Sequence, residues 1–415
     1  MKKLLLTTFI SLSVLTAITY GADTIVPFGN SIWVHGYTYD NKNTMTFSKS
    51  AYYLSDLAKY NRGAGKGHEI SELSVYGPTI EISKPKSGPH LPNSYRFTYY
   101  PSRLMSGVTN NWDTWLGQVD SGYRDVHDYA RLTVDGTAKG KHVLNILDIS
   151  GVVGYAGSHG TFYLNSLDKP DATNLADFVA SQVCADDALT GVVFDIEPFT
   201  FSNDRGYLHG YGQKYFYTQI AKDFAGHYRD GKSDPLHCVN GAHKQGRIFG
   251  IYTMGDEVSG DIDAISDVLT QYGNGYFVYG LYDLNENQTP GVIDPPSQHA
   301  QEVAAEIAKD QKLADDHNIP FQFSIAAASS STQFESFGDQ SSGYKMIQYA
   351  QADLSAINNS SVRKDPLFKG VSIYATSEQL WAPDHSSPGK LIALKPSSIF
   401  EKSQTDVVSY LQQNL

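Results

Sequence analysis

The 415-residue chain has little cysteine and no excess of basic residues. Its two cysteines, Cys184 and Cys238, make a shared metal site the weaker interpretation, because no matching set of histidines accompanies them. Against 32 Lys and Arg stand 44 Asp and Glu, and the net charge of -12 argues against nucleic acid or an anionic membrane surface as the partner. A neutral or cationic ligand is the more natural expectation.

Long apolar runs are also missing after the first residues. Met1-Lys-Lys precedes an apolar stretch from Leu4 to Ile18 and the small residues Gly21 and Ala22, which is the arrangement of a secretory signal peptide. We predict a signal peptide over residues 1–21, cut after Gly21 or Ala22. No other stretch approaches the roughly 18 apolar residues that a membrane-spanning helix needs. The mature chain is therefore expected to be secreted or periplasmic, and we expect a monomer.

Eight apolar runs bounded by turn residues predict β-strands. They cover residues 31–37, 70–82, 142–148, 191–195, 247–252, 276–282, 320–325 and 368–374. Helical spacing of apolar residues predicts helices over 48–60, 172–184, 215–228, 262–272, 296–318 and 343–357. The alternation predicts one α/β domain over residues 22–415, a (β/α)8 TIM barrel with elaborated βα loops. An open doubly wound sheet is the weaker alternative because no Gly-rich phosphate fingerprint follows the first strand.

The barrel gives the two cysteines a place. Cys184 and Cys238 each lie a few residues before a predicted strand, so both fall in αβ connections at the bottom of the barrel. The two strands are consecutive and would be neighbours. Because an exported chain favours oxidation, we predict a structural disulfide there, far from the chemistry.

Two carboxylates end the fourth predicted strand, in the run Gly191-Val-Val-Phe-Asp195-Ile-Glu197. Side chains alternate along a strand, so Asp195 and Glu197 point the same way. Catalytic groups of TIM barrels collect at the C-terminal ends of the strands, which is where this pair lies. Neighbouring acids resist simultaneous ionisation, and in a partly desolvated site one of them keeps a proton, as a general acid must. The alternative is two solvated acids at a surface.

Other strand ends bring polar and aromatic residues to the same rim. The sixth strand ends in Tyr282 and Asp283, and the first ends near His35 and Tyr37. We expect the fourth and sixth strands to face each other across the barrel mouth, which would group Tyr282 and Asp283 with the two acids. The chain is also rich in aromatics, with 28 Tyr and 4 Trp, whose flat rings suit the faces of sugars.

These motifs resemble glycoside hydrolase family 18, the chitinases and endo-N-acetylglucosaminidases. The fourth-strand run is similar to the family pattern Asp-Gly-x-Asp-x-Asp-x-Glu, with Thr190 and Val193 in place of its first two aspartates. The sixth-strand run Gly280-Leu-Tyr-Asp is similar to the family's Met-x-Tyr-Asp, and Tyr37 matches its opening Gly-Tyr. Trp381 falls where the family often places a tryptophan under the reacting sugar.

The resemblance implies a glycan containing N-acetylglucosamine as the partner, with no cofactor and no metal. Glu197 would be the acid and Asp195 would orient the 2-acetamido group of the substrate, in substrate-assisted retaining catalysis. Tyr282 and Asp283 would hold the same group, and Tyr37 and Trp381 would contact sugar. Chitin, the N-glycan core and peptidoglycan all remain open as the glycan.

Competing functions stay open beside this one. The loss of the signature aspartate at Val193 favours a glycan-binding relative without catalysis. A metal-dependent phosphodiesterase barrel is the second alternative, motivated by His35 on the first strand and Glu81 on the second. Retaining glycosidases with a second acid on strand seven are disfavoured, because no acid follows that strand until Glu335. Residues 95–100, in the long connection after the second strand, predict a small hairpin or helix insert.

Overall fold

The computed structural model describes more than half of the chain. The described residues are 24–35, 38–39, 45–46, 60–83, 96–100, 142–151, 164–185, 187, 189–196, 199, 201, 211–253, 261–281, 295–326, 346–374, 381–383, 391–393 and 405–415. The predicted signal peptide, residues 1–21, lies outside them. None of the helices in these ranges has the length and apolar character needed to cross a bilayer.

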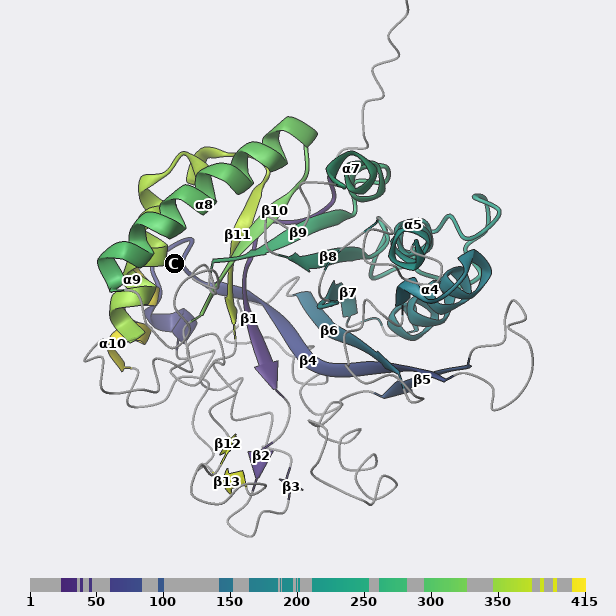
Figure 1. Cartoon of the computed structure of the whole chain (residues 1–415), viewed down its shortest axis with the longest axis horizontal. Coiled ribbons are helices and arrows are strands. Elements are labelled where there is room, and N and C mark those ends of the chain that lie inside the picture. The colour runs from purple at the N-terminus through teal and green to yellow at the C-terminus, as the bar shows by residue number, and fades with distance from the viewer. Residues whose placement is uncertain are drawn as a thin grey trace, which may run out of the picture.

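Eight parallel strands form a closed barrel at the centre of the molecule (Figure 1). They are β1 (Asn30–His35), β4 (Ile70–Ser83), β6 (His142–Gly151), β7 (Leu189–Phe194), β8 (Ile248–Thr253), β9 (Gly275–Gly280), β10 (Phe321–Ala326) and β11 (Phe368–Tyr374). Neighbours in this order pair with each other, and β1 pairs with both β4 and β11, which closes the ring. The predicted TIM barrel and all eight predicted strands are confirmed, with boundaries that shift by a few residues.

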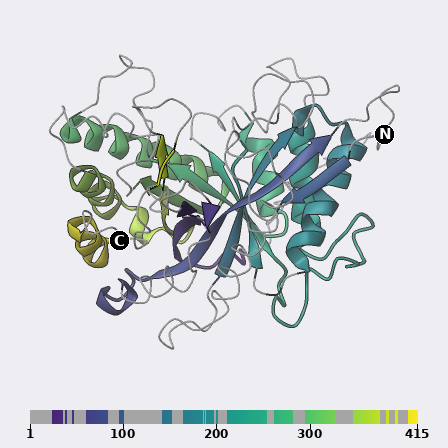
Figure 2. The same cartoon turned by 90° about the horizontal axis from the view of Figure 1, so that it is seen from below.

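Helices follow the strands and cover the outside of the barrel. They are α4 (Lys169–Cys184), α5 (Gly212–Phe224), α7 (Ile262–Thr270), α8 (Pro296–His317), α9 (Met346–Asn359) and α10 (Thr405–Asn414), with a short 3-10 helix η3 (Val362–Lys364). Figures 1 and 2 show α4, α5 and α7 on one side of the strands and α8, α9 and α10 on the other. Five of the predicted helices are confirmed, and the sixth, 48–60, lies outside the described residues except for Tyr60. Helix α10 was not predicted.

Short strands elaborate the connections. β5 (Arg96–Tyr100) runs antiparallel to the far end of β4, which confirms a hairpin in the insert after the second barrel strand. Two further ladders join β2 (Thr38–Tyr39) to β3 (Met45–Thr46) and β12 (Trp381–Pro383) to β13 (Leu391–Ala393). In Figure 1 both ladders lie beyond the arrowhead of β1, on the side of the barrel where the strands end.

The strands divide their side chains between two spaces. Residues at alternate positions, such as Val192, Phe194, Phe249 and Ile251, join the helices in one continuous hydrophobic core outside the barrel. The positions between them point into the barrel, as the period of two requires. Buried inward residues include Ser31, Trp33, Glu72, Ser74, Tyr276, Gln322, Ser324 and Ser372. The outer space is therefore apolar, while many of the described inward side chains are polar.

Residues 24–29 cross the bottom of the barrel, where the strands begin. The Ile25 N–H donates to the Gly273 carbonyl at 2.8 Å, just before β9, and the Gly29 N–H donates to the Lys369 carbonyl at 2.9 Å in β11. Gly370 has φ +117°, and a Cβ there would come within 2.4 Å of the Gly29 carbonyl oxygen. The close approach of this segment therefore requires glycine at position 370.

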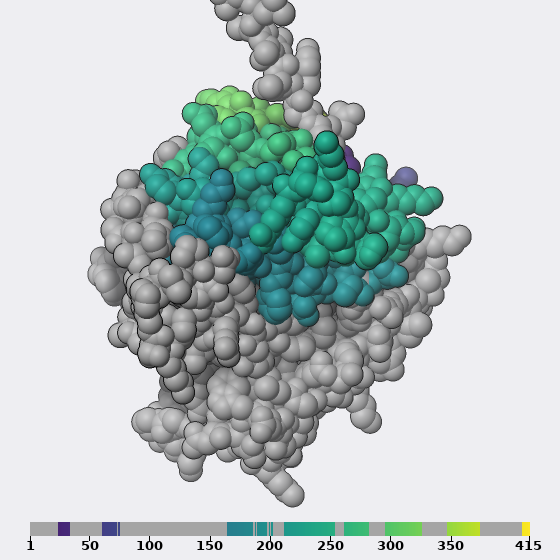
Figure 3. Space-filling model, turned by 90° about the vertical axis from the view of Figure 1, so that its right-hand side faces the viewer, coloured from purple at the N-terminus to yellow at the C-terminus, as the bar shows by residue number. Residues whose placement is uncertain are grey.

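A disulfide also lies at the bottom. Cys184, the last residue of α4, is bonded to Cys238 in the loop before β8, with an S–S distance of 2.11 Å. Both side chains are buried. Figure 3 faces this side of the molecule and shows α4, α5 and the loop leading to β8 as one blue-to-teal surface. The predicted disulfide and its place beneath neighbouring strands are confirmed.

Candidate active site

The structure describes two of the six predicted site residues, Asp195 and Trp381. Asp195 directly follows β7, at its C-terminal end. Trp381 is the first residue of β12 and lies opposite Ala393. Four predicted residues lie outside the described ranges: Tyr37, Glu197, Tyr282 and Asp283. Their places at the rim therefore remain predictions.

The neighbours of Asp195 in the chain set the direction of its side chain. Val192, Phe194 and Ile196 all belong to the outer hydrophobic core. Val193 is 2% exposed and takes no part in that core, so it faces the barrel interior. By the alternation of strand side chains Asp195 faces the same way, and it is partly exposed. An ionisable group at the rim and open to solvent on one side meets the first requirement of a TIM-barrel active site.

An aromatic pair lies across the barrel at the level of this rim. The rings of Trp33 on β1 and Tyr252 on β8 meet edge to face, with centroids 5.8 Å apart. These strands are halfway round the ring from each other. The Trp33 indole N–H donates to the Ser372 hydroxyl at 2.8 Å. Because Val193 pairs with Gly250, Asp195 follows β7 at the rung of Tyr252. Both rings of the aromatic pair are buried inside the barrel.

Val193 stands where the family pattern has its middle signature aspartate. It lies opposite Gly250, and a Cβ at Gly250 would come within 2.8 Å of the Tyr276 ring. The Tyr276 ring therefore fills the space beside Val193 that a larger residue on β8 would need. Below it, complete burial raises the pKa of Glu72 to about 8, although Gln322 donates toward its carboxyl at 3.5 Å. Glu72 is thus a neutral acid near pH 7. Burial, and after it the charge that Glu72 carries once it ionises, raises the pKa of Tyr276 well above its ordinary value.

The fourth and sixth strands are closer than predicted. The ring order places only β8 between β7 and β9, so the two strands do not face each other across the mouth. With strand spacings of about 4.8 Å they lie roughly 10 Å apart on one side of the barrel. The prediction of facing strands was wrong because it ignored that opposite strands in an eight-stranded ring are four apart. The strand end before Tyr282 therefore lies one strand away from the strand end at Asp195.

Three aromatic residues near the site escaped the sequence predictions. Trp33 and Tyr252 lie inside the barrel near Asp195, and Tyr217 lies on α5 behind it. The alternation of side chains along a strand could have predicted that Trp33 and Tyr252 face the barrel interior, because each directly follows an outward-facing isoleucine, Ile32 or Ile251. No signal of this kind exists for Tyr217, because a helix gives no register against a strand.

A metal site at His35 and Glu81 does not fit the strand register. His35 pairs with Tyr76 on β4, and Glu81 lies five residues further along that strand. At about 3.3 Å per residue this is roughly 15 Å, too far for both residues to bind one metal ion. Within the described ranges, no three His, Cys, Asp or Glu side chains are grouped to hold a metal.

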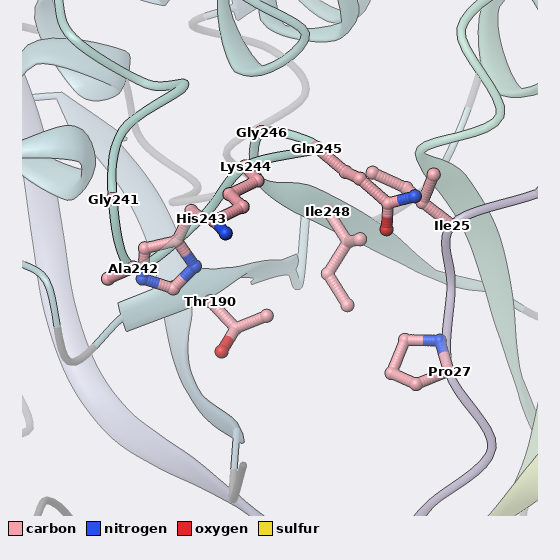
Figure 4. Close-up of a pocket in the computed structure, with 10 residues that line it drawn as sticks. All are labelled: Ile25, Pro27, Thr190, Gly241, Ala242, His243, Lys244, Gln245, Gly246 and Ile248. Atoms are coloured by element: carbon pink, nitrogen blue, oxygen red, sulfur yellow. The ribbon is translucent and has the colours of Figure 1, made fainter.

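A cavity of about 510 Å³ lies at the opposite end of the barrel (Figure 4). His243 and Lys244, from the loop before β8, lie across it from Ile25 and Pro27, with Thr190 between them. Its lining comes from the N-terminal ends of strands and from the segment that closes the bottom. Because TIM-barrel chemistry takes place at the C-terminal face, this cavity is not the candidate active site.

Comparisons with known proteins give structural likenesses only. No family model and no curated protein matches the chain. A GH18 chitinase from Pseudoalteromonas aurantia is 14% identical, with a TM-score of 0.40 over 83% of this chain and 93% of that one. A chitinase from Ipomoea carnea is 13% identical, with a TM-score of 0.39 over 83% and 94%. An endo-beta-1,4-glucanase from Xanthomonas axonopodis pv. citri is 12% identical, with a TM-score of 0.46 over 92% and 99%. At such scores the fold assignment rests on the strand pairings themselves.

Proposed function

We propose that this protein is an exported glycoside hydrolase that cleaves glycans containing N-acetylhexosamine. The observation that carries the proposal is Asp195, partly exposed and directed into a closed barrel at the end of its fourth strand. Glu197 follows Asp195 by two positions, so strand alternation predicts that it points the same way. The two acids match the last aspartate and the glutamate of the family 18 pattern.

The proposed reaction is substrate-assisted and retaining. Glu197 donates a proton to the glycosidic oxygen and later takes one from water. Asp195, ionised, orients the 2-acetamido group and stabilises the positive charge that develops as its carbonyl oxygen attacks the anomeric carbon. Tyr282 hydrogen-bonds the acetamido oxygen and Asp283 positions that group. Tyr37 and Trp381 contact the sugar rings.

The test is the Glu197→Gln variant on a panel of chitin oligomers, an N-glycan core and peptidoglycan fragments. Loss of the general acid is expected to lower kcat by about 10²- to 10⁴-fold. Glu69→Gln is the matched control, since Glu69 is exposed and lies just before β4, at the far end of the barrel. Equal turnover in wild type and Glu197→Gln would refute the proposed acid. Substrates without the N-acetyl group are expected to react very poorly.

Glycan binding without turnover is the second candidate function. It is favoured by Val193, a buried apolar side chain where the family pattern has an aspartate. Tight binding of an N-acetylglucosamine oligomer by the wild type, with no product formed, would select it. Loss of activity in EDTA would instead contradict the metal-free reaction.

A further inference from the structure

Two aspartates meet between helices α4 and α5, which pack side by side outside the barrel (Figure 1). Asp223 on α5 is 1% exposed, and the side chain of Asp177 on α4 is 12% exposed. A hydrogen bond joins the two carboxyl groups. Because two like charges in a buried contact repel each other strongly, the two groups cannot both be ionised at little cost.

Each of these carboxyl groups has one oxygen with a donor and one without. The Gln219 amide donates to Asp223 Oδ1 at 2.7 Å, and the Tyr228 hydroxyl donates to Asp177 Oδ2 at 3.2 Å. Asp223 Oδ2 and Asp177 Oδ1 are buried and receive no hydrogen bond from any described donor. An ionised carboxylate only accepts, so two ionised groups would leave both atoms without a donor. One proton between the two acids makes one of them a donor and satisfies both atoms.

The surroundings decide which acid holds this proton. The Arg229 guanidinium, from the loop that follows α5, donates to Asp177 Oδ2 through Nε at 2.6 Å and forms an ion pair with it. Asp177 therefore carries the negative charge. Among the described groups only the neutral Gln219 amide donates to Asp223. Burial, and after it the charge of Asp177, raises the pKa of Asp223 from 3.8 to about 8, so Asp223 is the acid that stays protonated.

The groups that act on the two acids come from three elements. They are Asp177 on α4, Gln219 on α5, and Tyr228 and Arg229 in the loop after α5. Neither α7 nor β8, which also pack on α5, brings a charged group that acts on Asp223. Burial raises the pKa of Tyr228, and an arginine keeps its charge in proteins, so neither residue titrates near neutral pH. Only the two acids titrate in this contact.

We propose that Asp177 and Asp223 share one proton, and that this proton makes the contact between α4 and α5 tighten as the pH falls. Separation of the helices exposes both acids to water, where an aspartate releases its proton near pH 4. The closed contact keeps the proton up to about pH 8. Between these values opening releases one proton, so it becomes about tenfold more favourable with each pH unit, and above pH 8 the dependence ends. This behaviour is independent of the proposed function.

The first experiment observes the shared proton. Carbon-13 NMR of aspartate-labelled protein follows the carboxyl groups over about pH 4 to pH 9, and Asp223→Asn identifies the signal of Asp223. This signal is expected to titrate at about pH 8. In Asp177→Asn it should titrate about one unit lower or more, because the negative neighbour is lost. A wild-type signal that titrates below about pH 5, or one that Asp177→Asn does not move, would overturn the shared proton.

The second experiment measures the opening of the contact. Amide hydrogen exchange of α4 and α5, followed by mass spectrometry and corrected for the intrinsic pH dependence of exchange, gives the opening constant from about pH 5 to pH 8. In the wild type this constant is expected to rise about tenfold per pH unit. The amide of Asp223→Asn can accept from Gln219 and donate to Asp177, but it has no proton to release. Its opening constant should change less than about twofold over the same range.

Two control variants separate this effect from those of other acids. Asp230→Asn changes an exposed aspartate in the same loop as Arg229. Glu72→Gln removes another buried acid with a pKa of about 8, inside the barrel. Both variants should keep the tenfold dependence in α4 and α5. A dependence that persists in Asp223→Asn, or that disappears in Glu72→Gln, would overturn its assignment to Asp177 and Asp223.

Discussion

The two ends of the barrel use the same strands differently. At the C-terminal end Asp195 is partly exposed, and the ring of Tyr217 on α5 packs edge to face against Phe194, the residue before Asp195. At the N-terminal end residues 24–29 and the Cys184–Cys238 disulfide close and brace the barrel. Changes at the N-terminal end should therefore lower stability without changing the proposed activity. Changes at the C-terminal rim should lower the proposed activity with little effect on stability. The following predictions test this division.

Removal of the disulfide is expected to have the largest effect on stability. The bond closes a loop with a sequence separation of 54, which corresponds to about 4 kcal/mol by the chain-entropy model. The double variant Cys184→Ala, Cys238→Ala should lose on the order of that free energy of unfolding, measured by urea denaturation. Its kcat at a temperature where it is folded should match wild type. A large loss of kcat in the folded variant would contradict the expectation that the N-terminal end affects stability but not activity.

Glu72→Gln is expected to change how stability depends on pH. Burial raises the pKa of Glu72 from 4.5 to about 8, so between these values the unfolded chain loses the proton and the folded chain keeps it. Stability of the wild type should then fall as pH rises through this window, by on the order of a few kcal/mol. The amide introduced by Glu72→Gln cannot ionise and can still bond to Gln322. Urea unfolding midpoints measured from about pH 5 to pH 9 should diverge between the two proteins, with the variant more stable at high pH; parallel curves would contradict the buried acid.

Gly250→Ala tests the middle of the barrel, where the two ends meet. The new methyl group would press on the Tyr276 ring at 2.8 Å. Such overpacking is expected to cost about 1–3 kcal/mol of stability. Because Gly250 lies opposite Val193, just below Asp195, we also expect a lower kcat, unlike the changes at the bottom. Differential scanning calorimetry and a kinetic assay measure the two effects, and an unchanged melting temperature would show that Tyr276 can move aside.

The smallest effect is expected at the bottom cavity. Replacing both His243 and Lys244 with alanine removes two polar side chains from its wall. Lys244 is exposed and His243 only partly buried, so stability should change by less than about 1 kcal/mol. The proposed activity should stay within twofold of wild type. A clear loss of turnover would show that this cavity contributes to the activity and would contradict the assignment of activity to the C-terminal face alone.

Much of the fold follows from local patterns in the sequence. Strands such as Phe368–Tyr374 carry alternating apolar residues between turn signals, and these features do not depend on distant contacts. The disulfide was predictable because the barrel places both cysteines below neighbouring strands. The direction of Asp195 also follows from parity along a single strand.

The contacts that complete the site depend on tertiary structure. Trp33 meets Tyr252 only because β1 and β8 stand opposite in a closed ring, and strand patterns do not contain that relation. Tyr217 reaches the strand of Asp195 through the rotation and height of α5 against β7, which the apolar spacing of a helix leaves open. Helix α10 escaped prediction because it is short, with apolar residues only at Val407, Val408, Tyr410 and Leu411 among its ten positions.

The closure of the barrel bottom has a consequence for the order of folding. β1 pairs with β11, and the Ser31 hydroxyl donates to the Ser372 hydroxyl across a separation of 341 residues. Until the eighth strand is available, one edge of β1 has no partner and residues 24–29 have nothing to bond to at Lys369. Such distant contacts form late and slow the search for the native state. During synthesis β1 can therefore pair with β11 only after the last barrel strand has been made. Until then the incomplete sheet has an unpaired edge to which strands of other chains can bind.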